Sequence, residues 1–141
     1  MVKTPVRALL VLGTALWCLA IVSAPLFDLP AVYLFFSRLC HQLPGRSWHI
    51  HGEQLAVCIR CTSIYLGFLA GLVLLEKPRV LWFEAAITMN IAQWIFSIFI
   101  SDAELLRVLV GGLLGATTAP IICSGLEEMF IKRVRTVNAS M

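Results

Sequence analysis

The sequence is organised around two neighbouring segments, Cys40-His41-Gln42-Leu43-Pro44-Gly45-Arg46-Ser47 and Cys58-Ile59-Arg60-Cys61-Thr62-Ser63-Ile64-Tyr65-Leu66-Gly67. Together with the loop between them, they contain three of the five cysteines and all three histidines. The second segment leads directly into an apolar run. A polar loop rich in potential ligands therefore adjoins a hydrophobic helix, and the rest of the chain has the character of a membrane scaffold.

The whole chain has the composition of an integral membrane protein. Its 141 residues are 60% hydrophobic and only 13% charged, which lies outside the range of ordinary soluble domains. A helix needs about 20 apolar residues to cross a bilayer. We therefore predict an all-α fold, an integral membrane four-helix bundle formed by a single transmembrane domain over residues 1–141. Its helices are expected over residues 6–27, 55–75, 82–101 and 105–127, with a short interfacial segment and a Cys/His loop (36–61) between the first two.

The second helix is long enough to cross a bilayer only if it begins before its uncharged run. Its uncharged run is short, so we expect the helix to begin near Leu55, with Arg60 snorkelling at the interface on its flexible stem. A cleaved signal peptide is the alternative interpretation of the apolar run near the N-terminus. That run is longer than a usual signal core, and Pro25 would directly follow a cut after Ala24, where cleavage is poor, so we favour a transmembrane helix.

The basic residues predict an orientation. If four helices cross, one side of the membrane holds seven Lys or Arg residues, and the other holds Arg38, Arg46, Arg60 and Arg107. Cytoplasmic loops carry the excess of such residues. We therefore expect a multi-pass protein of the plasma (inner) membrane with both termini in the cytoplasm and the Cys/His loop outside. The basic residues form no single stripe, which argues against nucleic acid as a partner. The expected partner is the lipid bilayer, and another membrane subunit is a further candidate.

Two helices carry small residues at the spacing that permits close packing in lipid. These residues are Gly67 and Gly71 in the second helix, and Gly111, Gly112 and Gly115 in the fourth. This spacing permits each of them to pack closely against another helix in a compact four-helix bundle.

The third helix carries polar residues on one face, because Asn90, Gln93 and Ser97 recur at spacings of three and four. In lipid such a face points into the bundle. We expect it to form interhelical hydrogen bonds, with a polar lining beneath the cysteines as the alternative.

The C-x-x-C pair, Cys58 and Cys61, falls at the predicted start of a helix. Free backbone N–H groups and the positive end of the helix dipole favour a thiolate there over a thiol. Such thiolates bind metals, exchange disulfides or close a structural disulfide.

A metal site is the interpretation that we favour. The candidate ligands are Cys40, His41, Cys58 and Cys61, a mixed sulfur and nitrogen set suited to zinc, copper or iron. Because neighbouring side chains point apart, His49 or His51 is an alternative fourth ligand. Gln42, Arg46 and Arg60 are expected to support the ligands by hydrogen bonds. The metal would serve structure, sensing or transfer.

A thiol–disulfide oxidoreductase is the second interpretation. Cys58 and Cys61 would exchange disulfides, with Cys40 as the third thiol, and the oxidising outer face suits this chemistry. The layout resembles that of the quinone-linked disulfide-generating membrane enzymes in architecture only. A quinone would then lie near Tyr65 and Arg60. The third interpretation is a non-catalytic membrane subunit or assembly factor whose cysteines fix the loop, so whether the chain is an enzyme depends on which of the three holds.

The two quoted segments resemble the signature of a family of small prokaryotic polytopic membrane proteins of unknown function, C-H-Q-x-P-x-R-S followed by C-x-R-C-x-x-I-Y-x-G. The resemblance covers most of the chain after Phe35. Gly45 stands where the family often has an acid, Ser63 where it often has glycine, and Asn90 where we expect an aspartate. The last difference puts in doubt any proton or cation transfer through that position. The resemblance implies a polytopic membrane protein and supplies no activity.

Overall fold

The computed structural model describes residues 4–99 and 104–139, and these are mainly helical. The helices are α1 (Pro5–Leu26), α2 (Pro30–Ser37), α3 (Ile59–Leu74), α4 (Val80–Phe99) and α5 (Glu104–Ala139), with a single 3-10 turn, η1 (Pro44–Arg46), before the hairpin. The strands β1 (His49–Ile50) and β2 (Glu53–Gln54) pair antiparallel. Apart from this hairpin and the connecting loops, the described chain is helical, and the predicted all-α class is confirmed.

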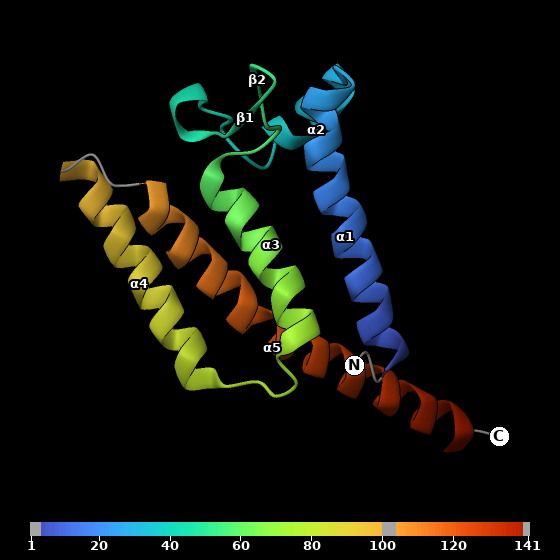
Figure 1. Cartoon of the computed structure of the whole chain (residues 1–141). Coiled ribbons are helices and arrows are strands. Elements are labelled where there is room, and N and C mark those ends of the chain that lie inside the picture. The colour runs from blue at the N-terminus through green and yellow to red at the C-terminus, as the bar shows by residue number, and fades with distance from the viewer. Residues whose placement is uncertain (1–3, 100–103, 140–141) are drawn as a thin grey trace.

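The long helices lie side by side around α3 and α5 (Figure 1). α3 packs most extensively on α5, α4 packs on α5, and α1 packs mainly on α3. α2 and the hairpin sit together at one end of the molecule, where α1 ends and α3 begins (Figure 1). The two segments that carry the three clustered cysteines therefore meet at this end, which we call the loop end.

Small residues let α3 and α5 come into backbone contact. A Cβ atom added to Gly67 would lie 2.1 Å from the carbonyl oxygen of Gly112, and one added to Gly115 would lie 2.0 Å from that of Ile64. Gly71 approaches Ala116 in the same way. The close packing expected from the glycine spacing is confirmed, and we call this contact the glycine seam.

The end of α1 opposite the loop end is bonded to α3. Thr4 caps α1, because its side-chain oxygen accepts a hydrogen bond from the backbone N–H of Arg7 at 3.3 Å. The buried Arg7 guanidinium then donates to the carbonyl oxygens of Leu72 and Leu75, each at 2.6 Å. A cation there satisfies the free carbonyl groups at the C-terminus of α3.

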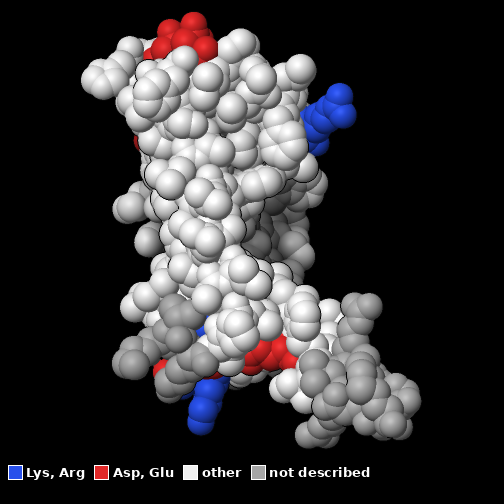
Figure 2. All heavy atoms as spheres, turned by 90° about the vertical axis from the view of Figure 1, so that its right-hand side faces the viewer, with Lys and Arg blue, Asp and Glu red and all other residues white. Residues whose placement is uncertain are grey.

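Two segments of the described chain are long and apolar enough to cross a membrane, Pro5–Leu26 and Glu104–Lys132. α3 has 16 residues, a length of about 24 Å, so it is shorter than a usual span. Along α1, Leu12, Leu16 and Leu19 are 59%, 58% and 63% exposed, as suits a lipid-facing surface. On the face shown in Figure 2, charged side chains gather toward the two ends, and the visible described surface between them is uncharged.

The helix ends differ from the predicted ones in a few places. The helix predicted over 6–27 spans Pro5–Leu26, and the one predicted over 105–127 continues to Ala139. The helix predicted over 82–101 spans Val80–Phe99, and the predicted residues 100 and 101 lie outside the described residues.

The difference that bears on the cysteines is at the start of α3, which was predicted near Leu55 and lies at Ile59. The Leu55 N–H donates to the Trp48 carbonyl at 2.7 Å, which continues the hairpin. Leu55, Ala56 and Val57 are buried in the core at the loop end. These three apolar residues thus form a buried non-helical segment.

The polar face of α4 makes bonds to other helices, as expected. The Asn90 amide donates to the carbonyl of Val110 in α5 at 3.0 Å, and the Gln93 side-chain oxygen accepts from Arg60 in α3. Ser97 is different, because its hydroxyl donates to Trp94 within α4. Two of the three residues therefore hold α4 against α3 and α5.

Candidate functional site

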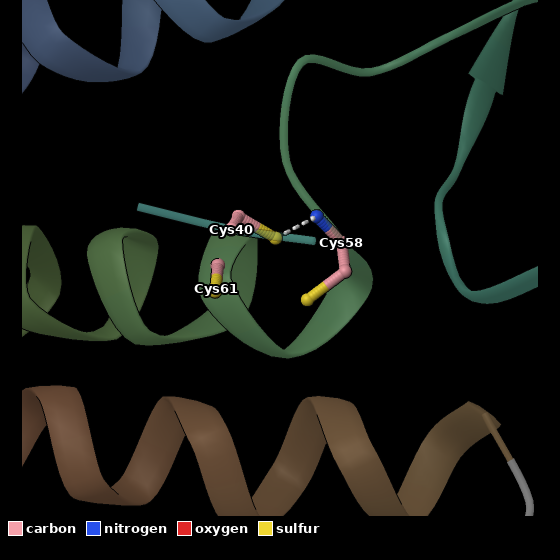
Figure 3. A group of neighbouring side chains, drawn as sticks. All are labelled: Cys40, Cys58 and Cys61. Atoms are coloured by element: carbon pink, nitrogen blue, oxygen red, sulfur yellow. Dashed lines mark hydrogen bonds between the residues drawn. The ribbon is translucent and has the colours of Figure 1, made fainter. Parts of the chain in front are cut away.

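Three cysteine sulfurs come together at the loop end. The Sγ atoms of Cys40, Cys58 and Cys61 all lie within 4.8 Å of one another. Cys40 follows α2, Cys58 is the N-cap residue of α3, and Cys61 lies in the first turn of that helix (Figure 3). Cys40 is buried and the other two are half-buried. We call these residues the sulfur cluster.

An aromatic core holds α2 against α1 and α3. Phe36 is only 1% exposed, and the Cys40 N–H donates to its carbonyl at 2.9 Å. Trp17 of α1 contacts Phe35, Phe36 and Tyr65 edge to face, with ring centroids 5.1 to 5.9 Å apart. This packing turns the chain back toward the molecule just before Cys40.

Gln42 joins the two segments that carry the cysteines. Its side-chain amide donates to the carbonyl oxygens of Tyr33 and Ala56, both at 2.8 Å. Its backbone has a φ of 48°, a left-handed conformation uncommon outside glycine. One amide therefore bridges the segment before Cys40 and the segment before Cys58. It contacts backbone groups, so it supports the sulfur cluster indirectly.

The hairpin sets the path of the chain into Cys58. His51 and Gly52 connect the strands with φ values of 53° and 90°, as a tight two-residue hairpin turn requires. His49 and His51 are exposed, and neither belongs to the group of clustered ligand atoms.

Hydrogen bonds at the start of α3 favour the thiolate form of Cys58. The Cys58 backbone N–H donates to the Cys40 Sγ at 3.2 Å (Figure 3). The pKa of Cys58 itself is lowered to about 5, chiefly by a hydrogen bond from the Cys61 thiol, with further bonds from the backbone N–H of Cys61 and the Cys40 side chain, while burial opposes the shift. Cys58 is therefore ionised at neutral pH, the form that binds metals and attacks disulfides.

A cavity of about 410 Å³ lies against the sulfur cluster. All three cysteines line it, together with a set of basic side chains, His41, Arg46, Arg60 and Arg107. His41 and Arg46 are exposed, and His41 is outside the group of clustered ligand atoms. Arg60, which was expected to snorkel at the membrane interface, is half-buried and donates to Gln93.

The two expected quinone contacts line different cavities. Tyr65 borders an apolar groove of about 680 Å³ that involves α1, α3, α4 and α5, whereas Arg60 lines the cavity at the sulfur cluster. Tyr65 lies one turn after Cys61 and packs in the same core.

Arg107 and Trp94 line the cavity at the sulfur cluster and were not predicted as site residues. The sequence signal for Arg107 was its assignment to the same side of the membrane as Arg46 and Arg60. For Trp94 the signal was its closeness to the polar face of α4.

The profile of a family described as "Predicted membrane protein (DUF2085)" matches residues 40–121. The match begins at the first cysteine of the sulfur cluster and covers more than half of the chain. The chain belongs to this family. The predicted resemblance to membrane proteins of unknown function is thereby confirmed. That the two quoted segments are the signature of this family stays a prediction.

Two archaeal proteins share short segments with this DUF2085 chain. An uncharacterized protein of Methanocaldococcus jannaschii is 46% identical over 43 residues, which is 30% of this chain and 28% of that protein. An uncharacterized protein of Methanothermobacter thermautotrophicus is 44% identical over 36 residues, 26% of this chain and 32% of that protein. The matched segments thus span about a third of either relative or less. No solved structure gives a significant match to the chain.

Proposed function

We propose that the sulfur cluster binds a transition metal ion of the zinc, copper or iron type. The observation that carries this proposal is the approach of three sulfur atoms, two from α3 and one from a distant segment, to within 4.8 Å of one another. Metal–sulfur bonds of about 2.3 Å at tetrahedral angles place ligand sulfurs about 3.8 Å apart. A contraction of about 1 Å or less would therefore close the cluster around an ion.

The donor set fits this class of ion. Thiolate sulfur selects Zn²⁺, Cu⁺ and iron over the hard cations, and Cys58 already favours the thiolate. His41 lines the same cavity, and we propose it as the fourth ligand. With His41 bound the set of four protein ligands is closed, as in structural sites, whereas with His41 released the fourth position faces the cavity and permits exchange. Because His41 is exposed and outside the group of clustered ligand atoms, this favours sensing or transfer over a purely structural role.

We also propose that the protein crosses the plasma membrane several times, with both termini in the cytoplasm and the sulfur cluster outside. The excess of basic residues in the segments away from the loop end supports this orientation. The lengths of α1 and α5 support two of the crossings. A reporter fused after Met141 should be active only in the cytoplasm, and activity only outside would reverse the orientation.

Metal analysis of the purified full-length chain tests the metal site. We expect stoichiometric metal in the wild type, and its loss in Cys40→Ser and Cys58→Ser. Cys18→Ser is the matched control, because Cys18 lies in α1 outside the sulfur cluster, and it should keep the metal. Wild-type protein that takes up no zinc, copper or iron would refute the proposal.

A second candidate function is thiol–disulfide exchange, and the pairing of an ionised Cys58 with the Cys61 thiol favours it. Oxidation would join the Cys58 thiolate to the Cys61 thiol, releasing one proton and two electrons. A quinone would take up both electrons, this proton and a second proton from water to become the quinol. Thiol trapping in intact cells distinguishes the two functions. A Cys58–Cys61 disulfide that disappears when quinone is depleted, in a protein without metal, would replace the metal proposal.

A further inference from the structure

The cavity at the sulfur cluster has a positively charged lining. Arg46 reaches it from η1 and Arg60 from the first turn of α3, so the two charges come from separate segments. None of the described residues that line the cavity is acidic. Arg107 lines it as well and also has a further interaction, so the unbalanced charge belongs to Arg46 and Arg60.

The positive charge persists in the metal-free protein and with a divalent ion bound. Arg60 donates to the side-chain oxygen of Gln93, a neutral amide that leaves the guanidinium charge in place. Three thiolates around Zn²⁺ or Fe²⁺ carry a net charge of −1, and a single Cys58 thiolate carries the same charge. The charges of Arg46 and Arg60 exceed this, so the cavity keeps an excess of one positive charge in these states, whereas three thiolates around Cu⁺ would balance the two arginines.

We propose that this cavity binds an anionic group, a carboxylate or a phosphate, beside the sulfur cluster, with Arg46 and Arg60 as its charge partners. Planar guanidinium groups match both anions through paired hydrogen bonds. A cavity of about 410 Å³ falls in the usual range for small-molecule sites. The anion-binding site stands on the cavity and its charges alone. Only its use, to deliver or receive the ion as an anionic complex, rests on the proposed metal function.

Paired alkylating reagents test the anion site without any metal. Iodoacetate and iodoacetamide have the same shape, but only iodoacetate is charged, and both alkylate the Cys58 thiolate. The full chain is reduced, treated with a chelator and reconstituted in nanodiscs of zwitterionic lipid. Trypsin cleaves after Arg60, so the products at Cys58 and Cys61 are measured on separate peptides.

We expect Arg46→Gln to lower the ratio of iodoacetate to iodoacetamide rates at Cys58 about fivefold at low salt, since one charge near the reaction is lost. Arg46→Lys should keep most of the wild-type ratio. Arg38→Gln is the matched control, because Arg38 is exposed at the end of α2 and does not line the cavity. The effect should shrink at high salt. An equal ratio in Arg46→Gln and Arg38→Gln would overturn the proposal.

A protection experiment then identifies the source of the anion. Inorganic phosphate or acetate that slows the iodoacetamide reaction in zwitterionic nanodiscs indicates a soluble ligand. Protection by phosphatidylglycerol in the nanodisc, without soluble anion, indicates a lipid headgroup. Protection by neither would overturn the proposal, because the arginines would then attract the reagent without holding an anion. These outcomes are independent of metal content, so failure of the anion site and failure of the metal site are distinguishable.

Discussion

The two ends of α3 are held in place by different kinds of contact. In its middle and second half, Gly67 and Gly71 bring the backbone of α3 against α5. At its start, the chain is held by side-chain bonds to backbone carbonyls, such as those of Gln42, and by the aromatic core. The two kinds of contact therefore have different roles. The glycine seam fixes the helix as a body, and the loop end fixes where the sulfur atoms lie relative to that body.

A larger side chain in the glycine seam should therefore have the largest effect. Gly115→Ala would place a Cβ atom 2.0 Å from the Ile64 carbonyl oxygen, which forces the helices apart. We expect the free energy of unfolding to fall by about 3 kcal/mol, the upper part of the usual range for overpacking. Thermal or chemical unfolding in detergent would measure it.

Gly125 offers the control for this experiment. It lies in the same helix, and a Cβ atom there would meet nothing within 4 Å. Gly125→Ala should leave the stability unchanged or raise it by up to about 1 kcal/mol through better helix propensity. Equal stability of the two variants would contradict the close approach of α3 and α5.

A change at the loop end should affect the site more than the fold. Gln42→Asn keeps a residue that tolerates the left-handed backbone, but its shorter amide does not reach both the Tyr33 and Ala56 carbonyls. We expect about a tenfold loss of metal affinity, the lower limit for residues that support ligands. Competition with a chromogenic chelator would show this. Ser37→Ala, a change at an exposed position of α2, serves as control, and unchanged affinity in Gln42→Asn would refute the role of this bridge.

The smallest change is expected when the pH is varied, because the alkylation rate of Cys58 should stay nearly constant. Its pKa of about 5 means that the thiolate is present above that pH and is lost as the pH falls through it. The rate of alkylation by iodoacetamide in the reduced, metal-free protein should be nearly constant between about pH 6 and about pH 8, whereas an ordinary thiol would react roughly eightyfold faster over that range. A rate at Cys58 that rises like that of an ordinary thiol would show that the start of α3 does not stabilise the thiolate.

The sequence predicts close packing at the glycine seam better than it predicts the backbone conformation at the loop end. Glycine spacing reports close helix packing directly, because only the absence of a side chain permits it. In contrast, Leu55, Ala56 and Val57 have no periodicity that separates a helical start from a buried non-helical segment. Their conformation follows from the hairpin, in which Leu55 is bonded to the Trp48 carbonyl. The start of α3 could therefore not be placed from local pattern.

The sulfur cluster was predictable in composition and less so in geometry. The C-x-x-C spacing brings Cys58 and Cys61 together at a helix start, whatever the rest of the chain does. The approach of Cys40 depends on the fold of α2 and on Gln42, neither of which has a simple sequence signal. The exposed position of His41 is set by the same backbone, and the bond from Arg60 to Gln93 needs the packing of α4.

X-ray absorption at the metal edge of the purified protein tests the central claim most directly, because it reports the number and kind of ligand atoms around an ion. The proposal predicts three sulfur neighbours at about 2.3 Å in the wild type and in Cys18→Ser. In Cys58→Ser the metal should be lost or keep fewer sulfur neighbours. A bound metal that has only oxygen and nitrogen neighbours, or a spectrum unchanged in Cys58→Ser, would contradict the assignment of Cys40, Cys58 and Cys61 as a metal site.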